Sequence, residues 1–236
     1  MAATGADADK SSQAATYQCL TRQEVVDKLD TIPVFHIMTR EKKICPVPDE
    51  SGALAVRFYA DPIEAESALV MVQALNPTSN LMIGVTPLGT AFALSEGWQP
   101  NGSSHPLQLY GSKAVLAAVA QESGGAALGE GASFALFGCE GLTSARVTPF
   151  WSNGASVKAT WAEARPGIPC PSELQVTHLH EVVKRTMTDT TYNWRTLMLI
   201  ATQKATEKAQ QCAEAEAALE SELRAKGLGD EPPPLE

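Results

Sequence analysis

Two histidines in the second half of the chain are the residues best placed to bind a metal. His178 and His180 are two positions apart, so on a strand they would share one face. Cys170 and Glu173 are the only further ligand types nearby, whereas a zinc site usually needs about four closely spaced ligands. We therefore interpret the two histidines as surface residues.

Neighbouring carboxylates could in principle supply a general acid and a general base. The candidates are Asp49 with Glu50 and Glu64 with Glu66. An acid/base pair needs an environment that shifts the pKa of one member, and no apolar sequence isolates either pair. These side chains are interpreted as solvated charges.

Signatures of common enzymes are absent from the sequence. It contains no Gly-x-Ser-x-Gly, no phosphate loop ending in Lys-Ser/Thr, no dinucleotide fingerprint and no His-Glu-x-x-His. A glycine-rich segment with Gly124, Gly125, Gly129 and Gly131 precedes a predicted strand at Phe134, whereas a phosphate-binding loop follows a strand and opens a helix. The sequence predicts a non-catalytic protein with no cofactor and no metal.

Charge and composition narrow the classes of partner. Of 236 residues, 27 are acidic and 18 are basic, which gives a net charge of −9 and disfavours nucleic acid and anionic lipid. No apolar run reaches the length of a membrane span, and the candidate at residues 197–201 is far too short, so a soluble or peripheral protein is expected. The polar start fits neither a secretory signal nor a transit peptide, and a targeting segment is expected to be missing from this sequence.

Cysteine spacing gives no sign of a disulfide scaffold. The five cysteines are odd in number and far apart, and we expect unpaired, mostly buried thiols, with a single disulfide as the alternative.

The first half of the chain reads as a polar tail over residues 1–18 followed by alternating helices and strands. Thr21 and Glu24 form a capping box that predicts a helix to Leu29. Asp61 followed by Pro62 predicts the start of a second helix. Strands are expected at residues 32–38, 52–59 and 81–86, the second helix at 62–75, a helical turn at 87–94, and little structure at 97–106.

The second half repeats this order. Phe58-Tyr59-Ala60-Asp61 matches Phe150-Trp151-Ser152-Asn153, and Val85-Thr86-Pro87-Leu88 matches Val176-Thr177-His178-Leu179, in almost one register. Ile32-Pro33-Val34-Phe35 would pair with Phe134-Ala135-Leu136-Phe137. An α/β (α+β) fold of two related units, residues 19–106 and 107–187, is expected, with helices at 112–121 and 156–164 and strands at 133–137, 145–151 and 174–179.

Residues 188–226 differ in composition and have no counterpart earlier in this interpretation. They are rich in Ala, Glu, Lys and Gln, which predicts one long helix over 189–226 with an apolar stripe that thins to alanine in the middle. Such a helix could pack on a partner, fold back on its own domain or stay partly disordered. Residues 227–236, with three prolines, are expected to be a flexible end.

Apolar side chains rather than polar ones mark the candidate binding surface. Methionine adapts to varied apolar segments, and a groove between the two units could use it in this way, the alternative being ordinary core packing. The candidate protein-binding residues are Met71, Met82, Phe92, Trp194, Met198 and Leu219.

The order of these motifs resembles the twenty-two-kilodalton Tic family of plastid protein import. That family has a Val-Pro-Val-Phe strand, an aromatic strand, a capped helix and a Val-x-x-Leu strand, in duplicate, and the similarity here spans about residues 20–187. The second unit lacks the proline of the first motif, and the long helix after Thr188 is an addition. The resemblance implies a pseudo-twofold body, without catalytic residues, that binds precursor proteins in the plastid intermembrane space or the cyanobacterial periplasm.

Two hypotheses follow. In the first, the chain is a chaperone-like or scaffolding component that binds apolar protein segments. In the second, it is an accessory subunit of a plastid membrane complex, a photosystem or light-harvesting assembly at the thylakoid, docked by its tail and C-terminal helix.

Overall fold

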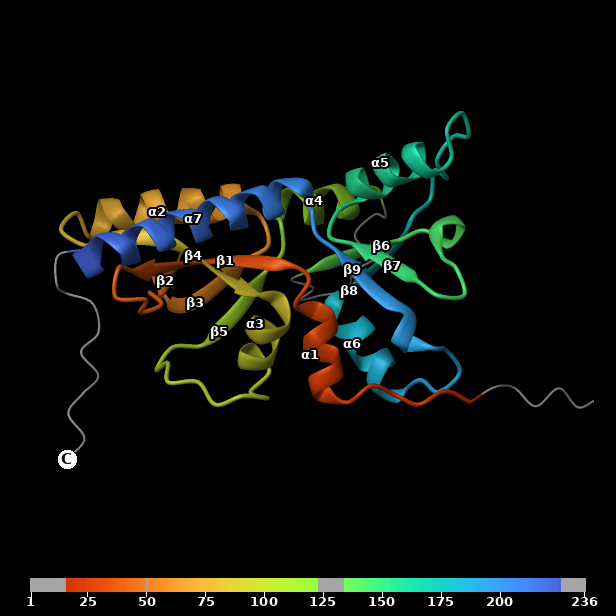
Figure 1. Ribbon diagram of the computed structural model, residues 1–236, viewed down its shortest axis with the longest axis horizontal. Helices are drawn as coiled ribbons and strands as arrows, with labels where there is room; N and C mark the ends of the chain where they lie inside the picture. Colours follow the sequence, from red (N-terminus) through yellow and green to blue (C-terminus); the bar gives the residue numbers. More distant parts are fainter. Residues whose placement is uncertain (1–15, 50, 123–133, 226–236) are drawn as a thin grey trace, which may run out of the picture.

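The computed structural model describes residues 16–49, 51–122 and 134–225 and has three layers (Figure 1). Two sheets lie side by side in the middle. The helices along one side are α2 (Pro62–Leu75), α4 (Lys113–Glu122), α5 (Gly154–Ala164) and α7 (Gln203–Ala225), and those on the other side are α1 (Arg22–Leu29), α3 (Leu88–Ser95) and α6 (Leu179–Thr188). Residues 1–15 of the predicted N-terminal tail over 1–18, the glycine-rich segment within 123–133 and the predicted flexible end at 227–236 lie outside the described residues.

The first sheet is built around β1 (Pro33–Thr39). It pairs antiparallel with β3 (Leu54–Tyr59) on one side and with β4 (Leu81–Pro87) on the other. The short strand β2 (Val47–Pro48) is antiparallel to β3, and β5 (Leu107–Tyr110) is parallel to β3.

The second sheet has the order β8-β6-β7-β9 and the same pattern of pairing. β6 pairs antiparallel with β7 and β8, and β7 pairs parallel with β9. Its strands are β6 (Ala135–Gly138), β7 (Thr148–Trp151), β8 (Gln175–His178) and β9 (Leu197–Ile200).

Registers in the two sheets place the three sequence matches at equivalent positions. Phe35 pairs with Tyr59 and with Val85 in the first sheet, as Phe137 pairs with Trp151 and Val176 in the second. Leu88 N donates to Ile32 O, as Leu179 N donates to Phe134 O. The aligned residues therefore make equivalent strand pairings and backbone hydrogen bonds in the two sheets.

Local capping signals set the starts of three helices, of which α1 and α2 begin as predicted and α5 begins two residues before the predicted Ser156. Both hydrogen bonds of the capping box between Thr21 and Glu24 are present at α1 (Arg22–Leu29), Asp61 accepts from Ile63 N at α2 (Pro62–Leu75), and Asn153 accepts from Ser156 N at α5 (Gly154–Ala164). Each cap satisfies an amide that the helix itself cannot pair. The remaining helices are α3 (Leu88–Ser95), α4 (Lys113–Glu122), α6 (Leu179–Thr188) and α7 (Gln203–Ala225), with 3-10 turns at Glu140–Leu142 and Trp194–Thr196.

Two helices cross from the sheet they follow to the other one. Helix α4 comes after β5 of the first sheet, but Val115 and Leu116 pack on the second sheet beside α5. Helix α7 comes after β9 of the second sheet, but Ala205, Ala209 and Cys212 pack on the first sheet beside α2. This exchange ties the two halves into one body.

A central core joins the two sheets on the side of α1, α3 and α6. Alternate strand residues supply it, because successive side chains of a strand point to opposite faces. Val34 and Phe58 of the first sheet and Leu136 and Phe150 of the second belong to this core, whereas their neighbours Phe35 and Phe137 face the other helical layer.

The predicted helix over 189–226 is wrong in its first third. Residues 194–196 form a 3-10 turn and Leu197–Ile200 form β9, so the helix begins only at Gln203. The Leu-Met-Leu-Ile run forms a strand because it pairs with β7. This partner lies far away in the sequence, so local helix propensity does not reflect the pairing. Strand β5 and helix α6 were also not predicted.

Burial of His36 makes stability depend on pH. The ring is 5% exposed on β1, packs edge-on against Phe58, and its burial lowers the pKa to about 4. The unfolded chain, with a pKa near 6.5, therefore binds more protons between these values, so stability is full above pH 6.5 and is lost as the pH falls toward 4.

Because of this one residue, we expect the free energy of unfolding to fall by roughly 3 kcal/mol between the pKa of the unfolded chain and that of the folded chain. Urea denaturation at pH 7.5, 6 and 5 would show a smaller fall for His36→Gln than for the native chain. Equal falls for the two proteins would mean that the imidazole is not buried.

Candidate protein-binding grooves

One groove lies between the end of α2, the start of β4 and the second half of α7, and we call it the α2–α7 groove. Its volume is about 890 Å³. Leu81 and Met82 of β4 form one wall and Ala215, Ala218 and Leu219 of α7 another, and Arg40, Asn80 and Glu222 place polar groups around them.

Helix α7 is packed on the first sheet in its first half and lines the groove in its second half. Ala205, Ala209 and Cys212 contact the cluster over the first sheet, whereas Ala215 and Ala218 line the open space above β4. Lys42 holds this part of the helix by ion pairs to Glu216 at 2.6 Å and Glu220 at 2.7 Å. Such exposed pairs contribute little stability each, but they fix the helix over the groove.

A second groove, the α4–α5 groove, lies over the second sheet. Its volume is about 920 Å³, and Val115, Phe137, Leu174 and Val176 supply apolar surface. Lys158 and Glu173 supply charges. Like the first groove, it lies between an exchanged helix and the helix that belongs to the sheet beneath it.

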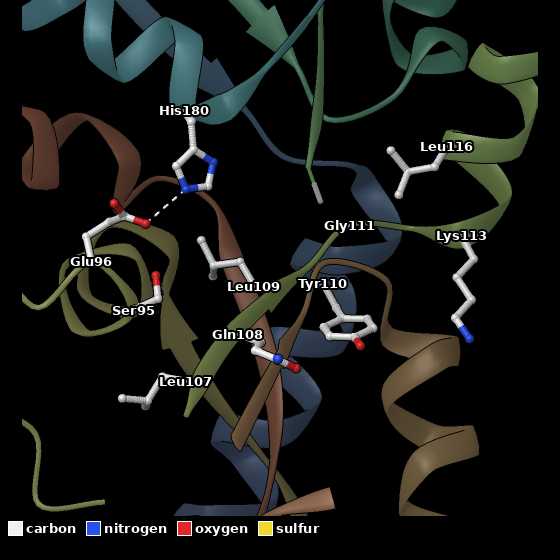
Figure 2. Close-up of a pocket in the computed structure, with 10 residues that line it drawn as sticks. All are labelled: Ser95, Glu96, Leu107, Gln108, Leu109, Tyr110, Gly111, Lys113, Leu116 and His180. Atoms are coloured by element: carbon white, nitrogen blue, oxygen red, sulfur yellow. Dashed lines mark hydrogen bonds and ion pairs between the residues drawn. The ribbon is translucent and has the colours of Figure 1, made fainter. Parts of the chain in front are cut away.

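A third opening lies beside β5 and has a volume of about 470 Å³; we call it the β5 cleft (Figure 2). His180 of α6 and Glu96, just after α3, face each other across one side, with Nε2 and Oε1 2.9 Å apart. Leu116 and Lys113 of α4 lie on the other side of the strand. This cleft exposes the edge of β5 and not the face of a sheet.

The structure brings together only two of the six residues predicted to bind protein. Met82 and Leu219 line the α2–α7 groove. Met71 is 41% exposed on α2 beside Arg57 and Tyr110, and Met198 is 49% exposed on β9 beside Leu20 and Arg195. Phe92 and Trp194 are buried in the central core and have almost no surface to offer a partner.

The α4–α5 groove and the β5 cleft were missed in the sequence. One usable signal was present for the cleft, because Leu107-Gln108-Leu109-Tyr110 and Leu197-Met198-Leu199-Ile200 share a Leu-x-Leu pattern and occupy equivalent strands. Nothing local marks the α4–α5 groove, since it depends on the crossing of α4.

Titratable groups do not assemble into a reactive centre in the described part of the chain. His178 and His180 have ring centroids 6.4 Å apart, and no group of three metal-binding side chains occurs among the described residues. Burial raises the pKa of both Cys45 and Cys212, which disfavours the reactive thiolate. Burial also raises the pKa of Glu64, but this carboxylate is held by the backbone N–H of Lys113 at 2.6 Å.

All five cysteines are described, and all are free thiols. The prediction of unpaired cysteines is confirmed, but only Cys139 is buried and the other four are partly exposed. No helix in the described ranges is both long and apolar enough to cross a membrane.

Comparisons with known proteins identify the fold. No protein-family model and no curated protein sequence matches the chain. Among solved structures, Tic22 from Plasmodium falciparum superimposes with a TM-score of 0.63 at 15% identity and covers 81% of this chain and 98% of its own. Anabaena Tic22, described as a protein of protein transport, gives a TM-score of 0.60 at 13% identity and covers 81% of this chain and 97% of its own. The chain has the Tic22 fold, as the sequence resemblance implied.

Proposed function

We propose that this chain is a non-catalytic component of plastid protein transport that binds apolar segments of other proteins in a chaperone-like way. The observation that carries the proposal is the match to almost the whole length of two Tic22 structures, one of them described as a protein of protein transport. The open grooves with apolar walls give such segments a place to bind.

The fold is proposed to consist of two diverged copies of one unit. The same strand pairings, the same registers and the same cap positions at Asp61 and Asn153 support this. In this proposal β9 and α7 are the second copies of β5 and α4, so residues 188–226 belong to the second unit and are not an addition to it.

The α2–α7 groove is the proposed contact for an apolar segment. Met82 supplies a flexible thioether, Leu219 a branched apolar side chain, and the alanines of α7 leave room for varied side chains. Polar groups at Arg40 and Asn80 could pair with the backbone of the bound segment at the rim.

A titration with a matched pair of variants tests this proposal. Fluorescence anisotropy with labelled transit-type peptides should give micromolar affinity for the native chain. Leu219→Glu should weaken binding at least about tenfold, because it places a charge against an apolar partner. The control Ala217→Glu makes the same change of charge at an exposed position of the same helix and should bind like the native chain.

Equal affinities for the native chain and both variants would remove the α2–α7 groove from the proposal. Absence of binding by the native chain would contradict the function itself.

The accessory-subunit hypothesis has less support. Its motive was a C-terminal helical appendage with no counterpart in the first unit, and Ala205, Ala209 and Cys212 of that helix pack on the first sheet of the same chain. A plastid location remains part of the proposal through the family resemblance.

A further inference from the structure

Strand β5 has an edge whose backbone groups point away from its only neighbour in the described residues. Val56 N donates to Pro106 O at 2.9 Å and Ala60 N donates to Tyr110 O at 2.7 Å. In a parallel ladder, residues that bond to the neighbour alternate with residues that face away. The N–H and C=O of Leu107 and Leu109 therefore point outward, and none of them meets a hydrogen-bonding partner among the described residues.

In the equivalent strand of the second sheet, the two outward carbonyl oxygens are paired with side chains of the same protein. Leu197 and Leu199 of β9 pair with Thr148 and Phe150 of β7. Leu107 and Leu109 of β5 pair in the same way with Val56 and Phe58 of β3, so the two pairs of leucines occupy equivalent positions. Lys28 Nζ donates to Leu197 O and Thr31 Oγ1 donates to Leu199 O, each at 2.9 Å. The two side chains come from α1 and its end, so side chains donate to the carbonyls of this edge, whereas none of the described residues donates to the outward carbonyls of β5.

The space beside the open edge suits an extended chain. Figure 2 shows β5 running through the cleft with the Glu96–His180 pair on one side and Leu116 with Lys113 on the other. Leu107, Tyr110 and Leu116 give apolar contact next to the outward backbone groups. Unpaired backbone together with flanking apolar side chains is what a strand added to a sheet edge requires.

We propose that the outer edge of β5 binds an extended, apolar segment of another polypeptide as an added strand. This inference rests on the proposed function for the kind of ligand and adds the mode of binding. Backbone hydrogen bonds at Leu107 and Leu109 give affinity that does not depend on side-chain sequence. Such binding would suit a protein that takes up many different precursors.

A pair of substitutions at one residue separates backbone pairing from side-chain contact. Leu107→Pro removes the outward N–H and blocks an incoming strand, while the bonds from β3 to residues 106, 108 and 110 stay intact. Leu107→Ala shortens the side chain and keeps the N–H. The probe is a short fluorescein-labelled peptide of alternating Leu and Thr, together with a copy N-methylated at alternate amides.

Strand addition predicts that Leu107→Pro weakens binding of this peptide at least about tenfold, whereas Leu107→Ala changes it less than about threefold. N-methylation of the peptide should weaken binding to a similar extent as the proline. Amide hydrogen exchange at Leu107 and Leu109 should slow when the unmodified peptide binds. Circular dichroism spectra and urea midpoints of the variants check that each one is folded.

Several outcomes would overturn the proposal. Tight binding that neither the proline nor N-methylation affects would refute strand addition and leave the proposed function standing, with the grooves as its site. No binding of any peptide to the native chain would remove both. A native dimer that Leu107→Pro converts to a monomer would assign the edge to a second copy. Slow exchange at Leu107 and Leu109 in the isolated monomer would assign it to the chain itself.

Discussion

Replacing Gly89 by alanine should destabilise the protein by about 3 kcal/mol or prevent folding. Gly89 lies in the first turn of α3 against α1, and a Cβ built there would overlap the carbonyl oxygen of Val26 and come within 2.6 Å of Asp30 Oδ1. A backbone oxygen cannot move aside like the end of a flexible side chain. The two helices would have to separate and open the central core, to which Leu88 and Phe92 of α3 belong.

Gly102→Ala is the matched control for this prediction. A Cβ at Gly102 meets no atom within 4 Å and the residue has no positive φ, so stability should stay within about 0.5 kcal/mol of the native value. Urea denaturation followed by circular dichroism measures both variants. Native stability for Gly89→Ala would mean that α1 and α3 do not approach this closely.

Ala205→Arg should cost on the order of 4 kcal/mol, because it places a large unpaired charge between α7 and the first sheet. Ala205 is 3% exposed and belongs to the cluster that includes Phe35, Ile37 and Val72. The guanidinium has no buried acidic partner in that cluster, and its bulk would push α7 away from β1 and β4.

The control Ala213→Arg makes the same change at an exposed position of α7 and should leave stability nearly unchanged. Thermal unfolding and gel filtration would measure the two proteins side by side. If Ala205→Arg were as stable as the control, α7 would not be docked on the first sheet. Its apolar stripe would then be free for a partner, and the accessory-subunit hypothesis would gain support.

Sequence alone was sufficient where short-range chemistry decides the structure. The start of α1 follows from Thr21 and Glu24, and the starts of α2 and α5 follow from Asp61 and Asn153, because a cap acts within a few residues. The strands β1, β3 and β4 are apolar runs of the expected length between turn residues, and their predicted centres are correct.

Elements that depend on distant partners were not predictable in this way. β5 and β9 have four residues each and become strands because β3 and β7 offer free edges about 50 residues earlier in the chain. Helix α6 begins at Leu179, directly after β8 ends at His178, so no turn residues in the sequence mark the boundary between them. The crossing of α4 and α7 has no local signal.

The candidate site shows the same division. Met82 and Leu219 were each recognisable as apolar side chains available for binding, and their meeting in one groove follows from the path of α7 over the first sheet. Phe92 and Trp194 have the same apolar character but face the central core. Composition identifies apolar residues, and only the packing of distant elements decides which of them reach the surface.

Suppression of aggregation of an unfolded client protein tests the central claim most directly. A chemically denatured client is diluted into buffer with increasing amounts of the native chain, with and without ATP, and light scattering is followed. We predict that scattering falls as the chain approaches an equimolar ratio and that ATP makes no difference. Undiminished scattering at a several-fold excess of the chain, or a fall that requires ATP, would contradict a non-catalytic protein that holds apolar segments.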